Sequence, residues 1–334
     1  MSKRVSLRDV ARHCNVSAMT VSCVVRQVRC VKESTRKRVE AAIEELGYQI
    51  DPALRALAAY RSKSAAATVA KYKASLAFFD SEPSDFSRSM YQHCRQEARR
   101  RGYDLKYFEQ PQTHEEQAKF SKLLWSQGIR GILFGPSQKE FVLEGFQFEH
   151  FAMVSLGAFQ HSPAVDSVCA DYFQGLYLAA QRCVERGHRN IALFLVSYLE
   201  ARTGHRWLGA YHSFCHHYQM KPVFWIYKDK ARPDNRMIRA WLKENRVDAV
   251  LTLAEFLPPA ACPPKLRQVF LNDWHVASDA WCVSVPQPLI AREGIHLLDD
   301  YLIHMKYGIP EYPKQISITS TFHEGNTDSR FATT

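Results

Sequence analysis

The sequence predicts two regions of different fold class, a small all-α domain at the N-terminus and a larger α/β region with doubly wound parallel sheets. Three observations support this prediction. The 334 residues are enough for two or three domains. Apolar residues recur at helical spacing as far as residue 47. From residue 74 onward, short apolar runs alternate with amphipathic stretches, a pattern typical of βαβ units.

Three short helices are expected within residues 1–48. Ser6 can cap the first, and Ser17 can cap the second after a tight connection at 15–17. The third starts near Ser34, and Gly47 supplies its left-handed stop. Their apolar faces consist of Leu7, Val10, Ala11 and Cys14, then Val21, Val24 and Val25, then Val39, Ala42, Ile43 and Leu46.

A fourth short helix and a linker are expected over residues 49–73. Asp51 can cap a helix that runs to about residue 60, with Pro52 at its first position. The stretch 61–73 that follows is small, polar and basic, which is typical of a linker.

The region 74–327 is expected to form two lobes with a cleft between them. About nine strands are many for a single sheet, so two doubly wound sheets are the better interpretation. In such folds ligands bind outside the carboxyl ends of the strands. The expected strands are 74–80, 103–109, 129–135, 151–157, 190–196, 222–227, 247–253, 266–272 and 281–285; the helices are one ending at 101, then 114–127, 173–186, 205–219, 234–245 and 289–306.

The charge is unevenly distributed along the chain. The net charge is +10, and residues 1–62 hold twelve Lys and Arg against six Asp and Glu. A basic excess concentrated at one end predicts a polyanionic partner there.

The cysteines and the apolar runs predict a cytoplasmic protein. Nine cysteines are an odd number, and no two have the CxxC spacing of a zinc or redox site. We expect free thiols in a reducing compartment. The first residues never reach a continuous apolar segment, and no later run approaches the 18 or so apolar residues of a membrane span. The protein is therefore expected to be neither exported nor membrane-embedded.

The first two helices have the spacing of a helix-turn-helix. Their connection is three residues long, and the second helix has a polar face opposite its valines. A generic three-helix core that binds another protein is the alternative. If the second helix enters a major groove, the side chains that face base edges are Ala18, Met19, Ser22, Cys23 and Arg26.

These segments resemble a known family. "VSLRDVARHCNVSAMTVSCVV" and "STRKRVEAAIEELGY" are similar to the DNA-binding domain of the lactose-repressor (LacI/GalR-type) family of bacterial transcription regulators. The likeness continues more weakly through "GHRNIALF" (187–194), "CAD" ending at Asp171, and "VPQPL" (285–289). The matched positions are Ser6, Asp9, Val10, Ala11, Val16, Ser17, Thr20, Val21, Ser22, Thr35, Arg36 and Val39.

The resemblance implies a division of labour along the chain. Residues 1–48 would bind the major groove, and a hinge helix would enter the minor groove as part of a homodimer on a pseudo-palindromic double-stranded operator. Leu57 would wedge into the central base step beside Arg55; alternatively, Leu57 packs against the partner's hinge. The remainder would be a periplasmic-binding-protein-like effector domain, followed by a tail at 328–334.

The resemblance also assigns roles to residues of the first domain. One departure is Cys23, where the family usually has Arg. Because that arginine is missing here, Arg26 is the strongest candidate for direct base readout. The expected major-groove residues are Ser17, Ala18, Met19, Thr20, Ser22, Cys23 and Arg26, and the expected phosphate contacts are Lys3, Ser6, Arg29 and Arg36.

The resemblance implies that the cleft holds an effector site for a small molecule, which is expected to be a sugar. Arg206, Asp171 and Asp273 match family ligand contacts, and Phe86 and Gln287 lie at positions where the family places an aromatic and a polar side chain. Each could instead be a loop residue in a surface hydrogen bond. After "VDAVLTL" the family commonly has Asn-Asp followed by a long helix, whereas this chain has Ala254-Glu255 and "FLPPAACPPK". The effector is therefore expected to be unusual, or the response lost.

Two other functions are compatible with parts of the sequence. His212, Cys215 and His216 fall on one helix face, which could indicate a metal-dependent enzyme, but no second ligand cluster or nucleophile motif accompanies them. An amphipathic helix with a buried cysteine is the preferred interpretation, with no catalysis, metal or cofactor. The other rival is a cytoplasmic ligand-binding protein whose helical N-terminus binds a partner other than DNA.

Overall fold

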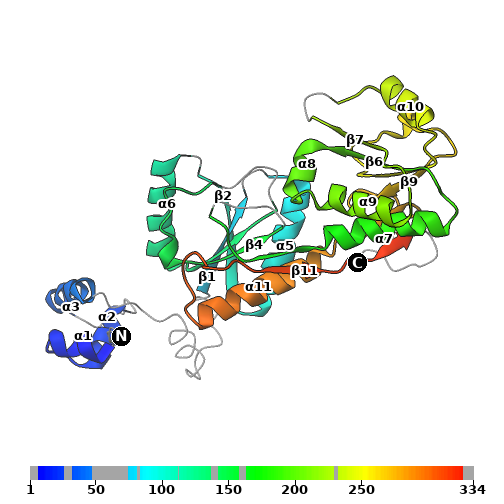
Figure 1. The fold of residues 1–334 in the computed structure, drawn as a ribbon. Helices are drawn as coiled ribbons and strands as arrows, with labels where there is room; N and C mark the ends of the chain where they lie inside the picture. Colours follow the sequence, from blue (N-terminus) through cyan, green and yellow to red (C-terminus); the bar gives the residue numbers. More distant parts are fainter. Residues whose placement is uncertain are drawn as a thin grey trace. The chain divides into compact units, whose positions relative to one another are not determined.

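The computed structural model describes residues 7–25, 32–46, 74–80, 83–111, 113–136, 142–157, 163–228 and 232–325. The chain divides into two compact units, Met1–Ala74 and Ser75–Thr334 (Figure 1). The expected hinge helix and the whole linker, as well as the tail at 328–334, lie outside the described residues.

The first unit contains the three expected helices, α1 (Leu7–His13), α2 (Ala18–Val25) and α3 (Glu33–Glu45). Val10, Val21 and Val39 are completely buried, one from each helix. Because each valine comes from the predicted apolar face of its helix, the faces meet in a single core. The expected cap Ser6 and stop Gly47 lie outside the described residues.

The second unit contains two six-stranded sheets, each with its own helices (Figure 1). The first lobe has the strand order β11-β5-β4-β3-β1-β2. Its elements are β1 (Ala74–Asp80), α5 (Asp85–Arg100), β2 (Tyr103–Glu109), α6 (His114–Ser126), β3 (Gly131–Phe134), η2 (Phe148–His150), β4 (Ala152–Leu156), β5 (Ser167–Ala170), α11 (Gln287–Ile303) and β11 (Gln315–Ile318).

The second lobe has the strand order β12-β10-β9-β8-β6-β7. Only its β10–β12 pair is antiparallel among the pairs with a determined register in the described residues. Its elements are α7 (Tyr172–Glu185), β6 (Ile191–Val196), α8 (Ser197–Arg202), α9 (Arg206–His217), β7 (Phe224–Tyr227), α10 (Asn235–Glu244), β8 (Ala249–Thr252), η4 (Pro259–Ala261), β9 (Arg267–Phe270), β10 (Trp281–Val283) and β12 (Phe322–Glu324).

Both faces of the first sheet are buried. Phe78 and Phe79 are consecutive in β1 and completely buried, yet they belong to different core clusters. Successive side chains of a strand point to opposite faces, so each face of the sheet is covered. The doubly wound parallel α/β architecture predicted from the alternating pattern is therefore confirmed.

The chain crosses between the lobes three times. It passes from β5 to α7, returns from β10 to α11, and passes again from β11 to β12. Helix α11 packs on α5 and β4 of the first lobe, whereas α7 packs on α9 and β10 of the second. The two lobes are therefore interwoven and not consecutive in sequence.

Three strands and one helix were not predicted. Strand β5 is fully buried but only four residues long, and two of its residues, Ser167 and Cys169, are not typical of a strand core. Strands β11 and β12 expose much of their polar sequence because they lie at sheet edges. Helix α8 begins directly where β6 ends and is six residues long, too short for a clear apolar period.

Two further expectations about the whole chain can be compared with the structure. The seven cysteines whose side chains the structure describes are free thiols. None of the helices in the described part of the chain is long and apolar enough to cross a membrane.

Two glycines provide a matched test of packing at the end of β3 and in α9. A Cβ at Gly135 would lie 2.6 Å from the ring of Phe78 and 3.1 Å from the carbonyl oxygen of Phe79. Since that ring is completely buried, Gly135→Ala is expected to lower the free energy of unfolding by about 1–3 kcal/mol. Gly209 in α9 has nothing within 4 Å of such a Cβ, so Gly209→Ala is expected to raise it by about 0.5–1 kcal/mol.

Urea unfolding of both variants, followed by far-UV circular dichroism, measures these changes. Equal stability of the two variants would contradict the packing assigned to Phe78.

Candidate functional site

The start of α2 is held by its own hydroxyl side chains. The Ser17 hydroxyl oxygen accepts the Thr20 amide at 3.0 Å and lies 2.9 Å from the Thr20 hydroxyl. Val21 and Val24 are buried on the bundle side, whereas Ser17 and Ala18 are exposed. Val21 and Val24 therefore give the helix a face that packs into the bundle, as in a groove-binding helix, and the exposed Ser17 and Ala18 lie at its start.

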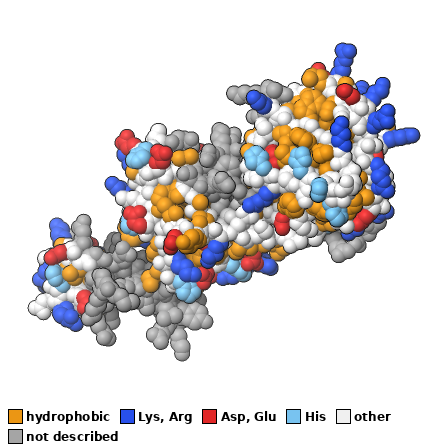
Figure 2. All heavy atoms as spheres, in the orientation of Figure 1, with side chains coloured by type: hydrophobic (Ala, Val, Ile, Leu, Met, Phe, Trp, Pro, Cys, Tyr) orange, Lys and Arg blue, Asp and Glu red, His pale blue; other side chains and the backbone are white. Residues whose placement is uncertain are grey.

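The structure covers only part of the predicted DNA contacts. Thr20 is half-buried beside Ser17, and Arg36 is half-buried on α3, where it has an interaction partner. Lys32, Lys37 and Arg38 are exposed around it, and Figure 2 shows Lys and Arg side chains at the surface of this unit. The side chains of Met19, Ser22 and Cys23, and the residues Lys3, Ser6, Arg26, Arg29, Arg55 and Leu57, lie outside the described part.

Arg206 bridges the two lobes. It is the first residue of α9 in the second lobe. Its guanidinium donates to the Gln315 side-chain oxygen of β11 at 2.6 Å and lies 3.8 Å from the Cys169 sulfur of β5. Both acceptors belong to the first lobe, so the side chain predicted most firmly from sequence lies where the lobes meet.

The Cys169 thiol beneath Arg206 is completely buried. Burial raises its pKa, and the neighbouring guanidinium acts in the opposite direction but does not cancel the effect. The Gln315 side-chain nitrogen lies 3.2 Å from the same sulfur. Burial thus favours the neutral thiol of Cys169 under Arg206, and both described contacts of the guanidinium are with groups other than carboxylates.

The two predicted carboxylates are both engaged by the backbone. Asp171 caps α7, since its side chain accepts the Gln174 amide at 2.9 Å. Asp273 accepts the Val285 amide at 3.2 Å. In each case one backbone contact made by the aspartate is structural.

Phe86 and Gln287 contact residues that sequence reasoning did not select. Phe86 of α5 meets Trp274, which follows β9 in the other lobe, edge to face at a centroid distance of 5.6 Å. The Gln287 side-chain oxygen accepts the Ser89 hydroxyl at 2.7 Å. Its side-chain nitrogen is buried and has no partner among the described residues.

Asn272 is a candidate that the sequence analysis missed. It follows β9 and immediately precedes Asp273, and its side-chain oxygen is buried without a partner in the described part of the chain. The Asn272 oxygen is thus a buried acceptor without a donor, and the Gln287 nitrogen, at the start of α11, is a buried donor without an acceptor among the described residues. The sequence could have indicated Asn272, because it follows an apolar strand. Asp273 follows the same strand, however, and was chosen because it is charged.

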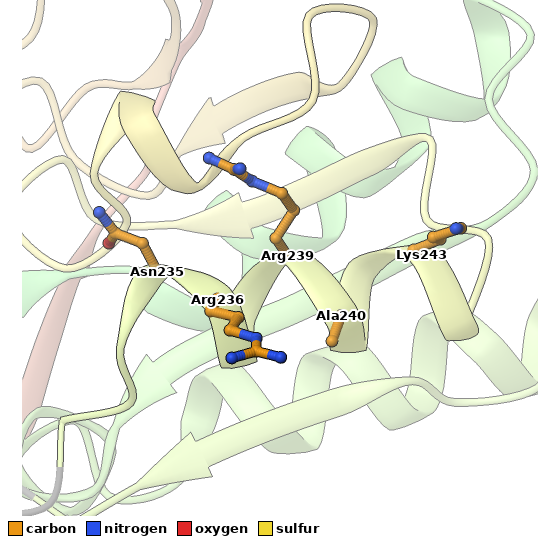
Figure 3. A pocket seen from close by; sticks show the side chains of 5 residues that line it. All are labelled: Asn235, Arg236, Arg239, Ala240 and Lys243. Carbon is orange, nitrogen blue, oxygen red and sulfur yellow. The ribbon is translucent and has the colours of Figure 1, made fainter.

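Two hollows at the surface lie away from these residues. One, of about 400 Å³, is lined by residues of α10, among them Arg236, Arg239 and Lys243 (Figure 3). The other, of about 570 Å³, is lined by Arg95 and its neighbours on α5. None of the predicted effector residues lines either hollow.

The histidine and cysteine cluster on α9 does not converge. Cys215 is buried in the core, whereas His212 and His216 are exposed. His212 instead packs against the Phe224 ring. Within the described ranges no three His, Cys, Asp or Glu side chains are placed to hold a metal ion.

The departure after β8 is also visible in the structure. Ala254 and Glu255 lie in a turn after this strand, and the only helical element before β9 is the three-residue η4. The long helix that the resemblance would place here is replaced by a proline-rich connection.

Comparison with known proteins agrees with this arrangement. Residues 6–51 match the family described as "Bacterial regulatory proteins, lacI family", and residues 73–221 match "Periplasmic binding proteins and sugar binding domain of LacI family". The HTH-type transcriptional repressor PurR of Escherichia coli O139:H28 is 28% identical over 234 residues. That match covers 69% of this chain and 65% of the relative's length.

Solved structures show the same fold. The lac repressor dimer bound to operator and the anti-inducer ONPF has a TM-score of 0.59 at 19% identity, covering 97% of this chain and 99% of that one. The complex of the transcriptional regulator CelR with cellobiose has a TM-score of 0.54 at 19% identity, covering 96% and 98%. The two family matches, the curated relatives and these folds lead to one conclusion: the chain belongs to the LacI family of bacterial regulatory proteins.

Proposed function

We propose that this chain is a sequence-specific DNA-binding transcription regulator, a repressor, whose operator affinity is changed by a small-molecule effector. The observation that carries the proposal is the joint presence of a capped, outward-facing helix α2 and a two-lobed domain bridged by Arg206. The relatives support it, since the curated ones are named transcriptional repressors and the lac repressor structure is a dimer on its operator.

The DNA-binding part reads sequence mainly through apolar contact and one arginine. The Ser17 and Thr20 hydroxyls hold the start of α2 and keep further hydrogen-bonding capacity for DNA, while the exposed Ala18 meets a thymine methyl group. Arg26 supplies a donor fork for guanine. Lys3, Ser6, Arg29 and Arg36 contact phosphates, and the hinge residues Arg55 and Leu57 enter the minor groove of a pseudo-palindromic operator in a homodimer.

The effector-binding part is suited to a polyhydroxylated ligand such as a sugar. A sugar hydroxyl both donates and accepts, which matches the unpaired Asn272 oxygen and Gln287 nitrogen. Phe86 and Trp274 supply aromatic faces from opposite lobes. Arg206, Asp171 and Asp273 add a charged fork and two carboxylate oxygens. The CelR structure is a complex with cellobiose, which supports a sugar as the ligand class.

Binding between the lobes would couple to DNA through lobe movement. A ligand that contacts both lobes favours one relative arrangement, and a coupling of about 1–3 kcal/mol changes operator occupancy roughly 5- to 150-fold. Such a regulator works in the cytoplasm, where its DNA is, and its action involves no catalytic step, metal or cofactor. The protein is therefore not an enzyme in this proposal.

Selection of bound DNA from a random duplex pool tests the DNA-binding proposal. The intact protein at moderate salt is expected to enrich one pseudo-palindromic sequence. Arg26→Ala should relax the preference at one base position per half-site, at a cost of about 1–3 kcal/mol. Lys3→Ala should weaken all sequences alike and reduce the log–log salt slope by about one. A pool that shows no enrichment with the intact protein contradicts the regulator and favours the ligand-binding protein with another partner.

The effector role of Arg206 is tested by repeating operator titrations in the presence of a sugar panel that includes cellobiose and trehalose. At least one sugar is expected to shift the wild-type operator affinity. Arg206→Ala should raise the concentration needed by about tenfold or more, because a charged hydrogen-bond donor is lost. Arg182→Ala is the control, since Arg182 pairs with Glu185 on the outside of α7. An unchanged sugar response in Arg206→Ala would remove Arg206 from the site.

A further inference from the structure

Helix α9 begins without a cap of its own. Its N-cap residue, His205, has a left-handed backbone (φ 60°) and makes no side-chain hydrogen bond to the helix. The first-turn amides of a helix need acceptors from outside it. The Leu208 amide finds one in the side chain of Glu200, at 3.0 Å. Glu200, a residue of the preceding helix α8, therefore caps α9 in place of its N-cap residue.

Glu200 also holds the turn between α8 and α9. Its carbonyl oxygen accepts the His205 amide at 3.0 Å and the Thr203 hydroxyl at 2.9 Å. The side chain is only 2% exposed. Backbone and side chain of one buried residue thus fix the chain path that leads directly into Arg206.

The buried carboxyl group of Glu200 carries an energetic cost. Its second oxygen has no partner among the described residues, and burial raises its pKa, against smaller opposing effects of the Leu208 amide and His205. An apolar side chain of similar volume would avoid that cost but would leave the Leu208 amide without an acceptor. The core alone does not explain a glutamate at this position.

The position of Arg206 depends on this turn. Arg206 is the first residue of α9, two positions before Leu208. From there its side chain must cross to Gln315 in the other lobe. If the first turn frays, the Arg206 backbone is no longer held in place, and the contact with Gln315 is expected to be lost.

We propose that Glu200 is the positioning residue for Arg206, because its buried carboxyl group caps α9 and so holds the guanidinium against strands β5 and β11. The proposal deepens the effector site and rests on the proposed role of Arg206. The function of the carboxyl group is that of an acceptor, so an uncharged acceptor can replace it.

A pair of variants of equal size isolates the acceptor in the intact protein. Glu200→Gln keeps a side-chain oxygen for the Leu208 amide, whereas Glu200→Met fills the same volume without one. Glu185→Met is the matched control, since Glu185 is an exposed carboxylate on α7 that pairs with Arg182. If Glu200→Met does not fold, Glu200→Asp, one methylene shorter, carries the same expectation.

The readout is the side-chain Nε–Hε signal of Arg206 in ¹⁵N-arginine NMR spectra, assigned by its loss in Arg206→Lys. Wild type, Glu200→Gln and Glu185→Met should show a signal distinct from that of exposed arginines. In Glu200→Met it should merge with them, and hydrogen exchange at Leu208 should accelerate on the order of tenfold.

Two results would overturn the proposal. One is a folded Glu200→Met protein that keeps the Arg206 signal, which would make Glu200 merely part of the core. The other is loss of that signal in Glu200→Gln.

The sugar panel adds an arm that depends on the proposed function. Glu200→Met should weaken the sugar response as Arg206→Ala does, and Glu200→Gln should restore it. If no sugar acts on the wild-type protein, the effector proposal fails, while the NMR signal still decides whether Glu200 positions Arg206.

Discussion

The threefold crossing of the chain between two parallel sheets constrains the rest of the larger unit. Parallel strands need long crossovers, and here three of the connections lead to the other sheet. Each lobe therefore contains segments that follow directly after segments of the other lobe in the sequence. Side chains far apart in sequence meet as a consequence: Arg206 of the second lobe contacts Gln315, 109 residues later in the chain.

The contacts between the lobes are of different physical kinds. Arg206 provides a charged donor that meets a neutral amide and a neutral thiol, whereas Phe86 and Trp274 meet through ring edges. Neither contact is a salt bridge, so neither has a desolvated opposite charge that would be costly to separate. Contacts of this strength can exchange for those of a ligand, which is what a binding site between movable lobes requires.

Periodicity in the sequence predicted the elements that bury a continuous apolar face. The bundle valines Val10, Val21 and Val39 and the run 74–80 are examples, because burial there demands a regular pattern. It did not predict β5, β11 or β12. Strand β5 is short and partly polar, and the other two are edge strands whose side chains are not required to be apolar.

The candidate site was predictable only where one residue carried a strong signal. Arg206 was found through the family resemblance, but its partners Cys169 and Gln315 lie 146 residues apart and meet only because β5 pairs with β11. The choice of Asp273 over Asn272 followed charge, whereas the structure engages the aspartate with Val285 and leaves the asparagine oxygen unpaired. Glu200 had no sequence signal, since its capping partner belongs to another helix.

The connection between β11 and β12 limits what the lobes can do. Only residues 319–321 join the two strands, a span of at most about 10 Å when extended. Ser320 within it is buried and its amide donates to the Gln174 side chain, while the Thr321 carbonyl accepts the Ser284 amide. These hydrogen bonds hold the short segment in place between the two strands. Such a short connection lets the lobes pivot about it but not move far apart, so in the proposed regulator a change in lobe arrangement would be a rotation.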